Sequence, residues 1–332
     1  MEDIKYIKKV EIENLWNKYD IEWNLNEDVN ILAGMNGSGK TTILSLIVNI
    51  ITAKLGTGTR IVDNIKITFN NNRYIIYRKI KDTVQNLVEK SKKDKFIKEY
   101  IQEIKQREGN DFKKILAIDG GLVSFENLQI TPEEFQKILG ISIINTFDQP
   151  LKDNESVRKL TDNNINTELD LQIFLLQKKY LEYQLNIGKQ AMKLLSLNQK
   201  LTEPEVDFKK DLFLDTIDSL FEPTDKKINR NENELVFKLG EQVLTPYMLS
   251  SGEKQLIIIL LTALIQEDKN FIFFMDEPEV SLHTDWQEKL IGNIRKLNSN
   301  AQIIIATHAP SVVVDGWMDK IFEIPEIIIK KR

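Results

Sequence analysis

A glycine-rich run in the first part of the chain has the residue types and spacing needed to bind a phosphate chain. It lies between an apolar run that predicts a strand and another that predicts a helix. In order, its residues are Gly34, Met35, Asn36, Gly37, Ser38, Gly39, Lys40, Thr41 and Thr42. Glycines let successive backbone N–H groups turn toward a polyphosphate, and the following helix N-terminus adds its positive end.

The spacing of this run is that of a P-loop, G-x-x-x-x-G-K-[ST], which assigns a role to each position. We expect Lys40 to reach the β- and γ-phosphates of ATP and Thr41 to offer its hydroxyl to Mg²⁺. The remaining nucleotide contacts of the loop are expected from Asn36, Gly37, Ser38, Gly39 and Thr42.

Two apolar runs in the last third of the chain end in polar residues. Residues 271–275 lead to Asp276 and Glu277, and residues 303–306 lead to His308. A buried parallel strand delivers the residues that follow it to the edge where an α/β sheet binds ligands. We therefore expect Asp276 to hold Mg²⁺ and Glu277 to act as general base on the water that attacks the γ-phosphate. His308 could donate to that phosphate or orient the water.

A Ser-Ser-Gly turn at 250–252 begins the long apolar helix predicted over 256–265. Such a turn at a helix N-terminus is a second anion site. One nucleotide cannot easily occupy two loops of one chain, so we expect two chains to pair head to tail and complete each other's sites. ATP would then hold the pair together, and hydrolysis would release it.

The residues around this turn resemble those of ABC-type ATPases. Leu-Ser-Ser-Gly-Glu at 249–253 looks like the signature motif, close to the Leu-Ser-Gly-Gly-Glu of the SMC, RecF and OLD branches. Further matches, in family order, are Phe147-Asp148-Gln149 with the Q-loop, Asp276-Glu277-Pro278-Glu279 with the Walker B end, Ser281-Leu282-His283 with the D-loop and His308 with the switch histidine. The resemblance implies that Gln149 touches Mg²⁺ and the attacking water. It also implies that Ser250 and Gly252 contact the γ-phosphate bound to the opposite protomer.

The longer run from 276 to 287 narrows the resemblance to OLD-like ATPases. These include the ATPase subunits of bacterial anti-phage systems such as PARIS and Septu and of some retrons. Thr284 stands where the usual proline follows Leu-His. OLD nucleases continue into a Toprim domain, whereas 24 residues follow His308 here. We therefore expect any nuclease activity to come from a separate protein, Toprim-like or HNH.

The resemblance implies an ATPase that acts as a homodimeric or larger switch, controls an effector nuclease in phage defence and responds to a phage protein. The alternative is a DNA-repair ATPase of the RecF or SMC type. It would bind DNA through residues 78–114, where twelve Lys and Arg stand against seven Asp and Glu. Such a charged run is also typical of a solvated helix face, which is the interpretation we favour. A transporter subunit fits the helical middle segment and the signature form poorly.

Two helical patterns occupy the middle of the chain, over 166–197 and 208–221. The first contains a heptad seam made of Leu171, Phe174, Lys178, Leu181, Leu185, Gly188, Met192 and Leu195. These helices predict a lid on the core or a stalk for a partner. We favour the lid because the second helix is too short to match the first.

Alternating strands over 4–15, 21–25 and 29–33 and hairpins over 65–77 and 115–125 surround the phosphate loop. Between the first two strands, Trp16 and Tyr19 could stack on adenine, although core packing is the role we favour for each. The predicted fold is α/β, an ABC-ATPase-type P-loop core of mixed sheet flanked by helices with an inserted helical lid or coiled-coil subdomain.

We expect the core over 1–150 and 223–332, a charged helical insert at about 81–114, and the helical lid over 151–222. The sequence has no cysteine and no apolar run near the ~20 residues of a membrane helix. These features predict a cytoplasmic protein without membrane contact.

Overall fold

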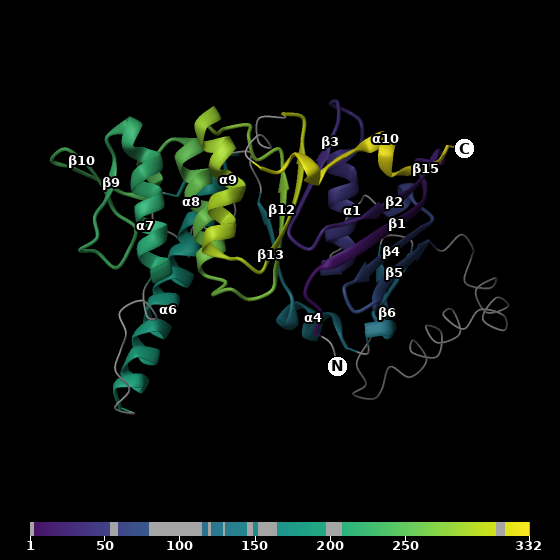
Figure 1. Cartoon of the computed structure of the whole chain (residues 1–332), viewed down its shortest axis with the longest axis horizontal. Helices are drawn as coiled ribbons and strands as arrows, with labels where there is room; N and C mark the ends of the chain where they lie inside the picture. The colour runs from purple at the N-terminus through teal and green to yellow at the C-terminus, as the bar shows by residue number, and fades with distance from the viewer. Residues whose placement is uncertain are drawn as a thin grey trace. The chain divides into compact units, whose positions relative to one another are not determined.

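The computed structural model describes residues 3–53, 59–79, 115–118, 121–128, 130–144, 149–151, 165–196, 208–309 and 316–331. The chain divides into two compact units (Figure 1). Unit 1 comprises Met1–Ile141 and Lys320–Arg332, and unit 2 comprises Ser142–Asp319. The predicted insert at 81–114 lies outside the described residues.

Unit 1 is built on a seven-stranded sheet in which neighbouring strands are antiparallel. The strand order is β15-β2-β1-β4-β5-β7-β6. The strands are β1 (Ile7–Leu15), β2 (Tyr19–Asn24), β4 (Asn64–Phe69), β5 (Tyr74–Lys79), β6 (Ile115–Ile118), β7 (Gly121–Ser124) and β15 (Ile328–Lys331). The predicted strands and both predicted hairpins are therefore confirmed, whereas the pairing of β15 with β2 was not predicted.

The strand before the phosphate loop, β3 (Val29–Ala33), pairs in parallel with β14 (Ile321–Glu323). The first four residues of β3 are buried, as expected of a central strand. Helix α1 (Lys40–Thr52) follows and contacts β5, and its buried residues include Ile43, Ile47 and Ile50. Strand, loop and helix thus occur in the predicted order.

Two short helices complete unit 1. Helix α4 (Pro132–Ile138) begins with a capping box: Thr131 Oγ1 accepts from the Glu134 backbone N–H at 3.2 Å, and the Glu134 carboxylate accepts from the Thr131 N–H at 2.8 Å. Its Phe135 packs between the rings of Phe69 and Phe125. Helix α10 (Ile324–Ile327) leads from β14 into β15.

Unit 2 is organised around one helix that is buried on all sides. Helix α8 (Ser251–Leu264) is buried from Gly252 to Leu264 and contacts α6, α7 and α9. Those helices are α6 (Glu168–Ser196), α7 (Phe208–Phe221) and α9 (Thr284–Leu297). This burial explains why the α8 sequence is apolar over several consecutive residues rather than on one face. The sequence analysis did not predict α9.

The described strands of unit 2 include a parallel pair and a small antiparallel sheet. In the pair, β12 (Phe271–Asp276) and β13 (Ala301–Thr307) run in register, with Asp276 opposite Ala306. The small sheet has the order β11-β10-β9. Its strands are β9 (Lys227–Ile228), β10 (Phe237–Leu239) and β11 (Gln242–Leu244). Strand β8 (Gly140–Ile144) lies at the boundary of the two units.

Helix α6 is present as predicted, but the heptad seam is not the stripe that it buries. Its buried residues include Ile173, Tyr180 and Tyr183, which lie on another side of the helix. The seam residues Leu185 and Met192 are 64% and 73% exposed. The helix contacts α8, and its role as a lid stays a prediction. Within the described ranges, no helix is both long enough and apolar enough to cross a membrane.

Candidate functional site

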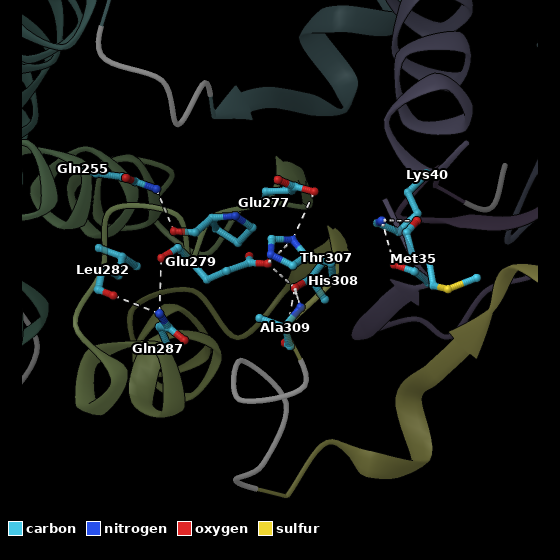
Figure 2. Close-up of polar contacts among 12 residues, drawn as sticks. Met35, Lys40, Gln255, Glu277, Glu279, Leu282, Gln287, Thr307, His308 and Ala309 are labelled. Atoms are coloured by element: carbon cyan, nitrogen blue, oxygen red, sulfur yellow. Dashed lines mark hydrogen bonds and ion pairs between the residues drawn. The ribbon is translucent and has the colours of Figure 1, made fainter. Parts of the chain in front are cut away.

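The phosphate loop of unit 1 is closed over its own lysine. Lys40 is 4% exposed, and its Nζ donates to the carbonyl oxygens of Gly34 at 2.8 Å and Met35 at 3.2 Å (Figure 2). Asn36, Gly37 and Thr41 are exposed. A phosphate oxygen would give Lys40 a charged acceptor in place of these neutral carbonyl acceptors, and charge-assisted hydrogen bonds are the stronger kind.

Gly39 is required at the point where the loop enters α1. Its φ of 103° lies in the left-handed region, and a Cβ there would lie 2.3 Å from the Trp16 ring. Trp16 is 38% exposed and contacts the Tyr19 ring edge to face, with 6.4 Å between ring centroids. The expectation of core packing is therefore wrong for Trp16, whose indole lies against the phosphate loop. Stacking on adenine stays a prediction.

The signature turn of unit 2 is a helix cap with exposed hydroxyls. Ser250 Oγ accepts from the Glu253 backbone N–H at 3.3 Å, while Glu253 Oε2 accepts from the Ser250 N–H and Oγ, each at 2.9 Å. This reciprocal arrangement is a capping box. Ser250 and Ser251 are exposed, whereas Gly252 is buried. The tip of α8 is thus ordered by its own side chains and open to an anion from outside the chain.

The second oxygen of the Glu253 carboxylate, which orders this turn, is also hydrogen-bonded. Glu253 is 1% exposed, and its Oε1 accepts from Lys226 Nζ at 2.8 Å and Thr224 Oγ1 at 3.0 Å. Burial alone would raise the pKa of Glu253, but the hydrogen bonds from Lys226, Ser250 and Thr224 outweigh it and lower that pKa. The sequence analysis missed Thr224 and Lys226, because no spacing rule links them to the signature motif.

The next residue of α8, Lys254, makes a buried ion pair. Its Nζ lies 2.8 Å from Asp170 Oδ1, and the two side chains are 9% and 3% exposed. The other oxygen of Asp170 accepts from the backbone N–H groups of Asn166 and Thr167, which cap α6. The Gln149 carbonyl accepts from the Glu168 N–H at 2.9 Å in the same turn. Gln149 is exposed, and the Q-loop residues 147–148 lie outside the described residues.

The ends of β12 and β13 bring two predicted catalytic residues together. His308 Nδ1 lies 3.2 Å from Glu277 Oε1 and 3.6 Å from Glu279 Oε1 (Figure 2). The Glu277 N–H donates to the Ala306 carbonyl at 2.8 Å, and Glu277 has a φ of 46°, which is rare for a residue with a side chain. The roles of Glu277 and His308 in catalysis stay predictions.

Two glutamine amides hold the turn that follows β12. Gln255 of α8 donates to the Pro278 carbonyl at 2.7 Å, and Gln287 of α9 donates to the carbonyls of Glu279 at 3.2 Å and Leu282 at 2.8 Å (Figure 2). Because these bonds are made to backbone oxygens, they fix the path of the turn, which contains the D-loop.

The three residues predicted to bind Mg²⁺ fall in both units, Thr41 in unit 1 and Gln149 and Asp276 in unit 2. A hydroxyl, an amide oxygen and a carboxylate are all hard oxygen donors, which suit Mg²⁺. The described residues contain no group of three His, Asp or Glu side chains able to hold a metal by themselves. The joint metal site stays a prediction.

Comparison with solved structures agrees with the predicted fold. An SMC head bound to the C-winged helix domain of ScpA matches with a TM-score of 0.51 at 15% identity, over 96% of this chain and 93% of that one. This likeness shows the fold alone, a mixed α/β fold with sheets flanked by helices, and confirms the predicted fold class.

Curated relatives match over a shorter stretch. A retron Ec83 probable ATPase of Escherichia coli is 30% identical over an alignment of 97 residues, and the match covers 26% of this chain and 18% of that protein. An uncharacterized protein of Dictyostelium discoideum is 32% identical over an alignment of 93 residues, and the match covers 26% of this chain and 12% of that protein. The chain thus matches less than a fifth of the length of either relative.

A protein-family model matches most of the chain, including the motifs predicted to form the site. The model of the AAA ATPase domain matches residues 6–313, which include the P-loop, the signature turn and the ends of β12 and β13. The chain therefore belongs to the AAA ATPase domain family.

Proposed function

We propose that the chain binds and hydrolyses ATP as a switch whose sites are shared between two copies. The observation that carries this proposal is the contact of Gly252 with Ser281, where a Cβ on the glycine would lie 2.2 Å from the serine carbonyl oxygen. The turn proposed to meet a neighbour's γ-phosphate thus packs on the turn that follows Glu277. A movement of one turn is transmitted to the other because no space separates them.

The residues of the chain supply the chemistry of hydrolysis in this proposal. Lys40 binds the β- and γ-phosphates, and Glu277 accepts a proton from the attacking water. His308 lies beside Glu277 and orients the water or donates to the γ-phosphate. Thr41, Gln149 and Asp276 hold Mg²⁺, which neutralises charge on the phosphates. Ser250 and the backbone at Gly252 bind the γ-phosphate of the nucleotide held by the partner copy.

The Glu277→Gln variant tests the shared site. We expect it to bind ATP, to hydrolyse it at least about 100-fold more slowly, and to accumulate as a dimer because the step that releases the two copies is blocked. Light scattering with and without ATP measures the dimer. Glu288→Gln, an exposed residue of α9, is the matched control and should remain as active as the unaltered chain. A Glu277→Gln chain that stays monomeric with ATP bound contradicts the shared site.

We further propose that the chain is the ATPase and sensor subunit of a defence complex that controls a separate effector nuclease. The likeness of its sequence to a retron probable ATPase supports this role. Copurification from cells that express the native neighbouring genes, followed by mass spectrometry, tests it. A Toprim-like or HNH protein retained by the chain supports the proposal. Retention of DNA with no nuclease would favour the RecF- or SMC-like alternative.

A further inference from the structure

A second carboxylate, that of Glu279, lies near the imidazole of His308, which also contacts Glu277. Glu279 is 5% exposed, and its Oε1 lies 3.6 Å from the same imidazole nitrogen, Nδ1, that faces Glu277. Its other oxygen, Oε2, is buried and has no hydrogen-bond partner within the described part of the chain. All polar contacts of this carboxylate are therefore made by the oxygen that faces His308 and Thr307.

Thr307 fixes the position of that oxygen. Its hydroxyl donates to Glu279 Oε1, while the same Oγ1 accepts from the Ala309 N–H at 2.9 Å (Figure 2). Thr307 is 1% exposed, so neither bond competes with water. The hydroxyl thus connects the Glu279 carboxylate to the backbone on both sides of His308.

The backbone of Glu279 is fixed as well. Gln287 donates to its carbonyl, and Gln255 donates to the carbonyl of the preceding Pro278. A buried side chain on a doubly held backbone has few alternative positions, and turning this one would also take Oε1 away from the Thr307 hydroxyl. The site therefore favours one arrangement, in which Glu279 faces the Nδ1 side of the imidazole.

We propose that Glu279, held by Thr307, is a positioning residue that keeps a proton on His308 Nδ1 and keeps the imidazole beside Glu277. This inference rests on the proposed function for its catalytic consequence. A carboxylate that orients a histidine selects which ring nitrogen carries the proton. With Nδ1–H directed at two carboxylates, Nε2 of the neutral imidazole is an acceptor, which can orient the attacking water but has no proton to donate to the γ-phosphate.

The tautomer of His308 gives a direct test, because the chain has only two histidines, His308 and His283. We label histidine with ¹⁵N and record imidazole shifts of the ligand-free chain. In Glu277→Gln, the Nδ1–H form of His308 should persist because Glu279 still accepts. In the Glu277→Gln/Glu279→Gln double variant it should shift toward the Nε2–H form. His283, which is exposed and 3.9 Å from Asp285, should not change. A His308 spectrum that is the same with and without Glu279→Gln overturns the proposal.

Threonine variants keep the test valid if Glu279→Gln fails to fold. In the Glu277→Gln background, Thr307→Val removes the hydroxyl at nearly constant volume and should move the His308 shifts in the same direction as Glu279→Gln. In the same background, Thr307→Ser retains the hydroxyl and should keep the shifts of the Glu277→Gln chain. Equal spectra for Thr307→Val and Thr307→Ser overturn the role of the hydroxyl.

Measurements of kcat and KM distinguish a residue that positions His308 from one that only stabilises the fold. Glu279→Gln should lower kcat about 10-fold and leave KM unchanged, since it removes part of a general-base arrangement rather than a binding contact. In a His308→Gln background the same change should have little further effect, because Glu279 acts through His308. If Glu279→Gln lowers kcat by the same factor in the His308→Gln background as in the unaltered chain, the proposal is overturned. An active Glu277→Gln chain would instead refute the proposed general base, while the His308 shifts would still decide the role of Glu279.

Discussion

The Cα of Gly252 packs against the carbonyl oxygen of Ser281 so closely that no side chain fits between the signature turn and the D-loop. A Cβ at Gly252 would lie 2.2 Å from that oxygen, far inside van der Waals contact. Helix α8 and the segment that leads to Ser281 are also joined by a hydrogen bond, because Gln255 donates to the Pro278 carbonyl. The two turns therefore behave as one packed block.

Gly252→Ala should separate this block. The methyl group must displace the Ser281 carbonyl, which overpacks a buried site and costs about 1–3 kcal/mol of unfolding free energy. We expect denaturant unfolding of Gly252→Ala to show this loss of unfolding free energy. We also expect the variant to hydrolyse ATP more slowly. Gly292→Ala on α9 is the matched control, since a Cβ there meets nothing within 4 Å. In a helix interior, that change should stabilise the chain by roughly 0.5–1 kcal/mol. Equal stabilities for the two variants would contradict the close packing.

Lys254→Met should be strongly destabilising. It leaves the Asp170 carboxylate buried without its cation, and breaking a buried pair from one side costs about 3–5 kcal/mol. Arg230→Gln is the control, because Arg230 is 44% exposed beside Asp215 and Asp218 and an exposed pair contributes at most about 1 kcal/mol. Chemical denaturation of both variants measures the difference. A loss no greater for Lys254→Met than for Arg230→Gln would show that the α6–α8 pair contributes little.

The Glu253 carboxylate should make stability depend on acid. Because the pKa of Glu253 is lowered in the folded chain from its ordinary value of 4.5, its contribution is fully present above about pH 4.5 and is lost as pH falls through the folded pKa. Glu253→Gln removes that dependence. The difference in unfolding free energy between the two chains should therefore be largest near pH 7 and shrink below pH 4.5. A difference that grows in acid would show that the pKa of Glu253 is raised instead.

Local patterns were sufficient to predict much of the fold. Alternation of apolar and polar residues predicted β1 and β2. Helix α9 was missed although Leu290, Ile291, Ile294 and Leu297 have helical spacing, so its signal was available. The strand β15 was not predictable in this way, because its partner β2 lies far from it in the sequence.

Long-range contacts decided the remaining features. Helix α6 carries apolar residues on more than one side, and its contact with α8 and the buried Asp170–Lys254 pair select Ile173 and Tyr180 as the buried stripe rather than the heptad seam. Likewise, Glu277 and His308 could be expected at one edge of a parallel pair. The position of Glu279 beside the same imidazole depends on the course of the turn held by Gln255 and Gln287.

Lys40→Ala should abolish ATP binding without unfolding unit 1. Within the described residues, the Nζ of Lys40 donates to the loop carbonyls of Gly34 and Met35, so its removal leaves these acceptors to be reached by solvent. With ATP, the same Nζ would make charge-assisted hydrogen bonds, each worth about 1.5–3 kcal/mol, so losing them weakens binding by at least about 10-fold. Titration calorimetry with ATP measures this loss, and Lys289→Ala on the exposed side of α9 is the matched control. Unchanged ATP affinity in Lys40→Ala would refute the assignment of the phosphate loop.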